Sequence, residues 1–342
     1  MKLPWLMALL LVITLISGCI EYKRYEITAE DVLKDALEKC NSTSYEVTIL
    51  SYILPKDENF ENQGVKQKIG HGAFKGSNKF KIEDEEKIVV SNGSVMWIYW
   101  NATKHLIIND FSKSDEKPKG EFTKIFLDLL NNYDLNLRTT PNYYIINATS
   151  RINYPIKSKT VWIDKKTLMP LKVESKYELD ELNLTYVTEY KDLKFREFND
   201  SIFNVTPPKV KEFMRSFYFQ KIEDAQKKVN FTIVEPSYTA GCKLKGVNVI
   251  EQRDKNAVVL LYRGKCLLFV FESPVPIYEI VKGERIDISG VQALYREWEL
   301  GREVRFKLNS VVFEVMSDCL SKQKLIMVAK SIINQSSKPT NS

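Results

Sequence analysis

Hydrophobic positions in this 342-residue chain follow two periods, and the changes between them divide the chain into elements. After Thr28, with Asp31 three positions later, apolar residues recur at helical spacing, so we expect a helix capped by Thr28. Its apolar face consists of Val32, Leu33, Ala36, Leu37 and Cys40. The period then changes to two, and Tyr45, Val47 and Ile49 alternate with polar neighbours, as in a half-buried strand.

Short alternating segments separated by Gly, Asn and Ser turns predict a meander of strands. The strands are expected at 66–74, 79–84, 87–91, 94–100, 103–109, 142–150, 159–164, 168–178 and 182–195. A helix interrupts them at 121–131, with Phe122, Ile125, Phe126, Leu129 and Leu130 on one side. Such short connections join antiparallel neighbours, because parallel strands need long crossovers.

A proline pair in "FNVTPPKV" closes this region, and a second part with the same alternation follows. Phe213, Phe217 and Ile222 predict a charged connecting helix over 209–230. Further strands are expected at 231–234, 243–251, 257–263, 266–272, 283–289, 291–300, 303–307 and 311–316. Leu325, Val328, Ala329, Ile332 and Ile333 predict a last helix. The pattern therefore predicts an α+β protein, mainly antiparallel β.

The first residues form a short basic start, an apolar run and small residues before a cysteine, which is the pattern of an export signal. The tetrapeptide Ile16-Ser17-Gly18-Cys19 resembles the lipobox of lipoproteins, whose cysteine receives an S-diacylglyceryl group and an N-acyl chain. We expect a signal peptide at 1–18 and a lipidated tether at 19–26. Two alternatives stay open: an uncleaved membrane helix over 3–20, or Cys19 as an ordinary buried thiol after a cleaved signal.

Four further cysteines and nine glycosylation sequons agree with export. Cys242 and Cys266 fall on consecutive expected strands and are the predicted disulfide, whereas Cys40 and Cys319 are either joined to each other or buried as thiols. The asparagines that stand two before Ser or Thr are Asn41, Asn92, Asn101, Asn147, Asn183, Asn199, Asn204, Asn230 and Asn334. This density on a lipoprotein is typical of an archaeal cell surface.

Charge and histidine content point away from nucleic-acid binding and from catalysis. The net charge of +6 is spread evenly, whereas a nucleic-acid surface needs a concentrated basic stripe. His71 and His105 are the only histidines, and neither stands in an HExxH or Ser-His-Asp context. The chain also lacks GxSxG, CxxC and a glycine-rich phosphate loop. We therefore expect no enzyme activity, no metal and no cofactor.

Two hairpins resemble motifs of LolA/LppX-like lipoprotein carriers and RseB-like periplasmic regulators. "SNGSVMWIYW" matches through Asn92, Gly93, Trp97 and Tyr99, and "VWIDKKTLMPLKV" matches through Trp162, Ile163, Asp164, Lys165, Leu168 and Pro170. Asp164 to Thr167 supplies the turn of the second hairpin, and we expect Trp162 to pack inward beside Leu171 and Val173. The likeness covers roughly residues 27–208.

This resemblance implies an incomplete antiparallel barrel, closed on one side by helices, that holds a lipid or acyl chain. Strand 95–100 is apolar on both faces, so its second face needs a cover, either the helix 121–131 or a ligand. The candidate ligand-lining residues are Met96, Trp97, Tyr99, Trp100, Phe126 and Leu130. The RseB-like relatives imply an alternative, a regulatory or scaffolding module that binds a membrane-protein or envelope partner. The tether at Cys19 departs from the carriers, which shuttle freely.

The second part resembles a domain of unknown function that follows LolA-like domains in surface lipoproteins. The matching features are Phe231, Pro236, Tyr238, the "ISG" at Ile288 to Gly290, Trp298 and the final "AKSI". The expected organisation is a LolA-like open barrel over 27–208, the connecting helix over 209–230, a smaller α+β sandwich-like accessory domain over 231–334 and a disordered tail over 335–342. We expect a non-enzymatic protein, lipid-anchored to the cell membrane and facing outside.

Overall fold

The structure is a computed structural model, and it describes residues 27–55, 67–151, 156–179, 182–211, 213–252, 255–274, 283–298 and 301–336. Its helices are α2 (Ala29–Ser42), α3 (Glu121–Asn132), α4 (Ile222–Gln226) and α5 (Lys322–Ser336), with a short 3-10 helix η2 (Asp200–Ile202). The first strands are β1 (Ser44–Pro55), β2 (Lys68–Lys75), β3 (Lys79–Asp84), β4 (Lys87–Asn92), β5 (Val95–Trp100), β6 (His105–Lys113), β7 (Tyr133–Thr139), β8 (Tyr143–Ser150), β9 (Ile156–Asp164), β10 (Pro170–Leu179) and β11 (Leu182–Phe195). The later strands are β12 (Phe213–Phe219), β13 (Lys243–Gln252), β14 (Lys255–Arg263), β15 (Leu267–Ser273), β16 (Glu284–Ile288), β17 (Val291–Trp298), β18 (Gly301–Leu308) and β19 (Val311–Ser317).

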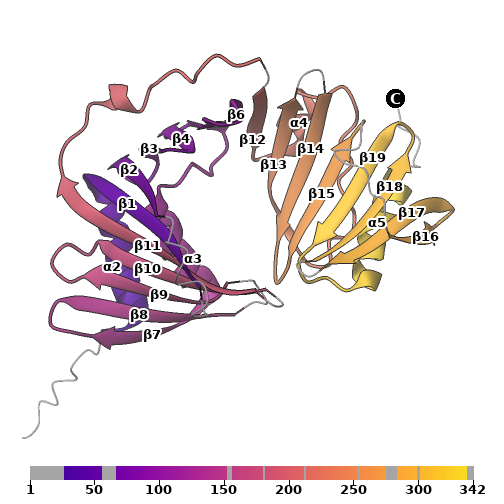
Figure 1. The fold of residues 1–342 in the computed structure, drawn as a ribbon. Coiled ribbons are helices and arrows are strands. Elements are labelled where there is room, and N and C mark those ends of the chain that lie inside the picture. The colour runs from indigo at the N-terminus through magenta and orange to yellow at the C-terminus, as the bar shows by residue number, and fades with distance from the viewer. Residues whose placement is uncertain are drawn as a thin grey trace, which may run out of the picture.

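These strands pair into one continuous, open ribbon. The pairings give the order β7-β8-β9-β10-β11-β1-β2-β3-β4-β5-β6 in the first half. They continue as β12-β13-β14-β15-β19-β18-β17-β16 in the second half. Each of these pairs is antiparallel except β6 with β12, which is parallel and joins the two halves (Figure 1). The predicted class, mainly antiparallel β with a few helices, is confirmed.

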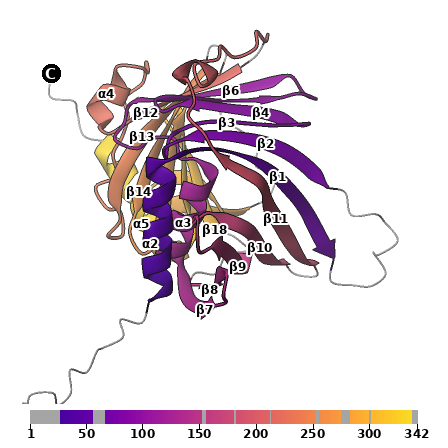
Figure 2. The ribbon, with the colours of Figure 1, turned by 90° about the vertical axis from the view of Figure 1, so that its left-hand side faces the viewer.

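The first half is a curved sheet with α2 and α3 packed against it (Figure 2). Aromatic rings fill the space between them, since Tyr45 and Phe74 both stack with Phe122, at centroid distances of 5.1 and 5.9 Å. Tyr190 from β11 meets the Phe122 ring edge-on at 4.7 Å. These aromatic side chains are almost fully buried, so they fix where α3 lies on the sheet.

Local sequence signals account for α2. Thr28 is its N-cap, and the Thr28 hydroxyl accepts from the backbone N–H of Asp31 at 3.1 Å while Asp31 accepts in return from the backbone N–H of Thr28, also at 3.1 Å. This reciprocal capping satisfies two backbone donors that a helix start leaves open. The helix buries Val32, Leu33 and Ala36, as predicted.

The chain after β11 crosses the outer face of β4–β6. Trp97 points to this face, where its Nε1 donates to the carbonyl oxygen of Val205 at 3.0 Å. Trp97, Val90 and Leu106 form a small apolar cluster against which Val210 packs. The segment around 205–210 therefore covers one face of the doubly apolar strand β5, a cover that neither predicted alternative supplied.

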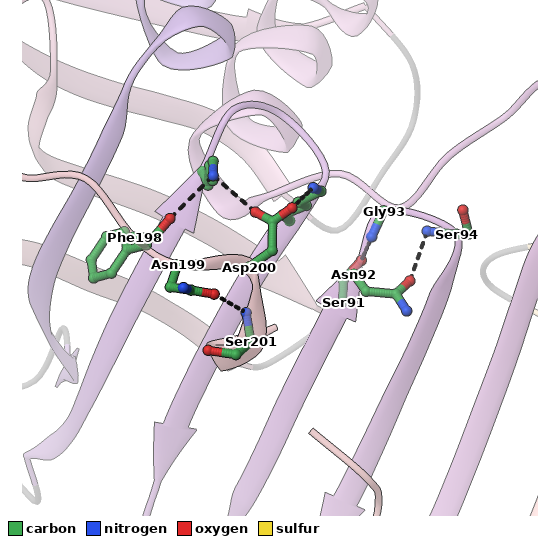
Figure 3. A network of polar contacts seen from close by, with 10 residues as sticks. Ser91, Asn92, Gly93, Ser94, Phe198, Asn199, Asp200 and Ser201 are labelled. Carbon is green, nitrogen blue, oxygen red and sulfur yellow. Dashed lines mark hydrogen bonds and ion pairs between the residues drawn. The ribbon is translucent and has the colours of Figure 1, made fainter. Parts of the chain in front are cut away.

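A polar network anchors the start of this crossing segment (Figure 3). The Asp200 carboxylate contacts Lys75 Nζ at 2.8 Å and Lys79 Nζ at 2.7 Å, on either side of the β2–β3 turn. Asn199 caps η2 by accepting from the backbone N–H of Ser201 at 2.9 Å. The two lysines hold the pKa of Asp200 down to about 2 through hydrogen bonds and charge attraction.

Nearby, the motif around Asn92 makes the β4–β5 turn (Figure 3). The Asn92 side-chain oxygen accepts from the backbone N–H groups of Ser94 and Val95 at 3.0 and 2.9 Å. Gly93 has φ +94°, a left-handed conformation that favours glycine. This motif therefore has a structural role.

The second half packs α5 against one face of its sheet. Leu325, Val328 and Ile332 of α5 are fully buried, which confirms the predicted helix. The same core contains Glu272 of β15, also fully buried, whose carboxylate oxygens accept from the backbone N–H of Val234 at 3.0 and 3.2 Å. Burial raises the pKa of Glu272 to about 8, against the lowering effect of that hydrogen bond.

The predicted connecting helix over 209–230 is wrong. Residues 213–219 form β12, and the helix α4 that follows has only five residues. The spacing of Phe213 and Phe217 is compatible with a helix. The segment forms a strand because it is hydrogen-bonded to two other strands, β6 and β13, and the local sequence pattern does not reveal these distant partners.

The predicted strand over 231–234 is also wrong, because side chains satisfy its backbone. Gln226 donates to the Phe231 carbonyl oxygen and accepts from the Ile233 N–H, both at 2.8 Å. The backbone N–H of Val234 donates to the Glu272 carboxyl group. With these partners the segment is irregular rather than a strand.

The predicted Cys242–Cys266 disulfide is wrong, since Cys266 is bonded to Cys319 with a Cα–Cα distance of 5.4 Å. Cys266 directly precedes β15 and Cys319 follows β19, two strands that pair through Leu268 and Ser317. Cys242 stays a buried free thiol, 3.6 Å from the Cys266 carbonyl oxygen. Cys40 is also a free buried thiol, and burial raises its pKa to about 12.

Trp162 does not point inward as predicted. Its neighbours Val161 and Ile163 are fully buried, whereas Trp162 is half-buried on the other face. There Lys172 Nζ lies 4.9 Å from the centroid of its ring. The Asp164 turn itself is as expected, with Asp164 accepting from the backbone N–H groups of Lys166 and Thr167.

Hydrophobic residues gather in two separate large clusters, one drawn from residues 29–190 and the other from 219–333. The division into two domains stays a prediction. Among the described helices, none is long and apolar enough to cross a membrane. The predicted signal peptide and tether lie within 1–26, outside the described residues.

Candidate functional site

A hollow of about 390 Å³ opens on the inner face of the first-half sheet, beside the start of α3. Small-molecule sites typically have about 300–1,000 Å³, so the volume is adequate for a ligand. Its apolar wall consists of Ile49, Phe80, Ile82, Val89, Met96 and Ile98. Its charged residues are Lys68, Asp84, Lys87, Lys119, Glu121 and Lys124.

Strand alternation explains why these apolar side chains face the hollow. Ile82 on β3, Val89 on β4 and Ile98 on β5 lie on adjacent antiparallel strands, where Val89 pairs directly with both Ile82 and Ile98. Successive residues of a strand point to opposite faces. Residues one position away, Ile88 and Trp97, therefore pack in the outer cluster instead. The hollow thus has a continuous apolar floor across three strands.

The mouth of the hollow is polar, and one of its carboxyl groups is held in place. Tyr190 Oη donates to Glu121 Oε1 at 2.6 Å. Burial raises the pKa of Glu121, although this hydrogen bond and the charges of Lys124 and Lys87 lower it. Lys68 is paired with Asp84 at 3.3 Å and with Glu86 at 2.5 Å. The charge of Lys68 is therefore neutralised by these carboxylates, whereas the charges of Lys87, Lys119 and Lys124 are not.

Lys87, Lys119 and Lys124 line the hollow together with Glu121, and within the described ranges none of the three forms an ion pair. Desolvation by the walls lowers the pKa of Lys124, attraction to Glu121 opposes this, and repulsion from Lys87 and Lys119 lowers it further. The hollow therefore combines an apolar floor with an excess of positive charge at its mouth.

Only one of the six predicted ligand-lining residues borders this hollow, namely Met96. Trp97 and Tyr99 belong to the outer cluster, and Trp100 lies 5.9 Å from the ring of His105. Phe126 is fully buried in the main core and Leu130 packs against that core. The structure therefore does not bring these six residues together around one hollow, and their role as ligand-lining residues stays a prediction.

The sequence signal that could have found the hollow is the inward register of β3, β4 and β5. Phe80 and Ile82 alternate with Lys81 and Glu83, and only the first pair faces inward. Lys81 and Glu83 instead line a shallow depression on the outer surface, together with His71. Neither histidine lies in the hollow.

Acidic and cysteine side chains do not form a metal site in the part of the chain that the structure describes. A group formed by Cys266, Asp318 and Cys319 comes close enough, but both cysteines are committed to the disulfide. A metal prefers the thiolate form of cysteine, which a disulfide does not provide.

The modification sites stay predictions. Cys19 lies outside the described residues, as do the side-chain surroundings of Asn183. The exposed sequon asparagines are Asn41, Asn147, Asn199, Asn204, Asn230 and Asn334. Asn92 and Asn101 are half-buried, and the Asn101 side-chain amide donates to the Glu85 carbonyl oxygen at 3.0 Å.

No family model matches this chain. The chain is 26% identical, over 338 residues, to an uncharacterized protein of Methanocaldococcus jannaschii, a match that covers 93% of this chain and 94% of that protein. Its solved structural neighbours include LolA-like and MucB proteins, the groups that the hairpin motifs resemble.

The Pseudomonas aeruginosa MucA/MucB complex aligns with TM-score 0.36 and 12% identity, covering 88% of this chain and 96% of that chain. A LolA superfamily protein from Nitrosomonas europaea aligns with TM-score 0.30 and 15% identity, covering 52% of this chain and 97% of that chain. An uncharacterized conserved protein from Thermus thermophilus aligns with TM-score 0.37 and 13% identity, covering 54% and 96%.

Proposed function

We propose that this protein is a non-enzymatic binding protein that holds an acyl chain or similar apolar ligand in the hollow beside α3. The observation that carries the proposal is the continuous apolar floor of Ile82, Val89, Met96 and Ile98 inside an open cavity. Exposed apolar surface of this kind is unfavourable in water, and covering it with a methylene returns about 0.8 kcal/mol.

The proposal includes the expected membrane location. Lipidation of Cys19 would hold the binding half at the outer face of the cell membrane, within reach of lipids. A diacylglyceryl group with an N-acyl chain suffices for stable attachment, whereas one chain is marginal. Replacement of Cys19 by serine should release the protein from membranes of its native host, and unchanged membrane association would contradict the anchor.

Titration calorimetry with straight-chain alcohols from hexanol to dodecanol tests the apolar site. Affinity should rise by up to about fourfold for each added methylene, the equivalent of about 0.8 kcal/mol, until the hollow is full. Ile98→Trp fills the floor and should weaken binding strongly. Lys81→Trp is the matched control, since it adds the same side chain on the outer face. Affinity that does not depend on chain length would refute the proposal.

A second candidate is a scaffolding role with an envelope protein partner. It is favoured by a groove of about 560 Å³ between the end of α3 and the β14–β15 turn. Arg151, Arg263 and Lys265 line this groove together with Asp128. A variant with Arg263 and Lys265 both changed to glutamate should then lose a co-purifying partner while alcohol binding is unchanged. Retention of the partner by this variant would count against the candidate.

A further inference from the structure

Three lysines at the mouth of the hollow carry more positive charge than the surrounding protein balances. Lys87, Lys119 and Lys124 share the hollow with two carboxyl groups, Asp84 and Glu121. Asp84 is paired with Lys68, and Glu121 accepts from the Tyr190 hydroxyl. By contrast, Lys68, which also lines the hollow, has two carboxylate partners, Asp84 and Glu86. The three lysines therefore leave an excess of positive charge at the hollow.

The backbone adds to the positive potential at this point. Helix α3 begins at Glu121, and its N-cap residue Gly120 provides no side chain to cap the first backbone N–H groups. The N-terminal end of a helix carries partial positive charge, which favours an anion there. Lys119 precedes the helix and Lys124 lies in its first turn, so both lysine side chains reach from this helix start to the hollow.

The apolar floor lies next to these amines. Lys87 and Val89 are two residues apart on β4 and both line the hollow, which places their Cα atoms roughly 7 Å apart. Val89 is in turn paired with Ile98 on β5. A charged group at the lysines and a chain on the floor can therefore belong to one molecule.

We propose that the ligand is an anionic amphiphile, whose phosphate or carboxylate head is bound by Lys87, Lys119 and Lys124 while its alkyl chain covers the floor. This inference rests on the proposed function, because it assigns the head group of the same ligand. An anion relieves the repulsion among the three amines, and hydrogen bonds between ionised partners are the strong ones. The positive helix end contributes in the same direction.

Calorimetry of the purified protein with dodecyl phosphate and dodecanol tests this assignment, since the two probes share a chain and differ in the head. Dodecyl phosphate should bind about tenfold or more tightly than dodecanol, and rising salt should reduce the difference. The variant with Lys87, Lys119 and Lys124 all changed to glutamine should bind both probes equally. Lys81→Gln, on the outer face of the same sheet, is the control and should change neither affinity.

The outcomes separate the two proposals. Equal affinity of the unaltered protein for both probes, with dependence on chain length retained, overturns the anion assignment and leaves the apolar site standing. Absence of binding by both probes overturns the proposed function itself. Inorganic phosphate that binds as tightly as dodecyl phosphate shows an anion site without a tail, and so overturns the amphiphile. A preference for phosphate that survives in the triple variant overturns the role of the lysines.

Discussion

Removal of the Cys266–Cys319 disulfide should destabilise the protein by an amount that the chain topology sets. The two cysteines are 53 residues apart, and the bond closes a loop that contains β15 to β19. In the loop-entropy model, closing a loop of that length reduces the entropy of the unfolded chain by about 14 cal/mol/K. This corresponds to about 4 kcal/mol at 25 °C.

The appropriate perturbation is the double change Cys266→Ala and Cys319→Ala. A single change of Cys319 would leave the Cys266 thiol next to Cys242, whose sulfur is already 3.6 Å from the Cys266 carbonyl oxygen. A substitute bond between them would close a loop of 24 residues and return about 3.5 kcal/mol, which would mask the effect. Removing both partners prevents this exchange.

Urea denaturation followed by fluorescence gives the free energy of unfolding for each form. The double variant should lose about 4 kcal/mol, and a reducing agent should produce the same loss in the unaltered protein but none in the variant. Cys242→Ala is the control and should cost only about 1 kcal/mol, as for a typical substitution. A loss below about 1 kcal/mol in the double variant, or a Cys242–Cys266 bond in peptides from native protein, would refute the reasoning.

Three other predictions concern single residues. Glu272 has a pKa of about 8 in the folded state against an ordinary value of 4.5, so the folded state retains a proton that the unfolded state loses. The free energy of unfolding should therefore fall by up to about 5 kcal/mol as the pH rises from 4.5 to 8. Glu272→Gln should remove this fall in denaturation experiments from about pH 4 to 9. Thr28→Ala removes the cap of α2 and should cost about 0.5–2 kcal/mol in urea denaturation, whereas an unchanged midpoint would show that the cap is dispensable. Trp97→Phe deletes the hydrogen bond to the carbonyl oxygen of Val205, an exposed residue, so it should cost about 0.5–1.5 kcal/mol, and hydrogen exchange should rise in residues 203–210 if the indole holds this segment.

The sequence predicted the elements whose signals are local. The helix α2 follows from Thr28 and Asp31, and β3 and β11 have the predicted bounds because alternation and turns mark both ends. The strand β7 was missed although its signal is local: Asn131 and Asn132 end α3. Tyr133, Leu135 and Leu137 then alternate with polar neighbours, as a half-buried strand requires.

Long-range pairing accounts for the other differences. The disulfide could not be assigned because β15 meets β19 across several intervening strands, and spacing along the chain does not show this neighbour. A ligand-holding hollow was expected in the first half of the protein, with Met96, Trp97, Tyr99 and Trp100 of β5 and Phe126 and Leu130 of α3 as its lining. Only the register of β3, β4 and β5 against one another tells that Met96 points inward and Trp97 outward. Lys87 of β4 and the two lysines at the start of α3, Lys119 and Lys124, also line this hollow although they are distant in sequence.

The single parallel contact between β6 and β12 determines how this molecule can be divided. A chain truncated directly after the proline pair would lack β12, the strand that pairs with β6 through Phe213 opposite Leu106 and Arg215 opposite Ile108. The edge of β6 would then be unpaired, and we expect the truncated chains to aggregate, because an unpaired strand edge can pair with another chain. Cleavage of the intact protein by a protease near residue 207, by contrast, would yield two fragments that stay associated until they are denatured. The reason is that β12 remains hydrogen-bonded to β6 of one fragment and to β13 of its own.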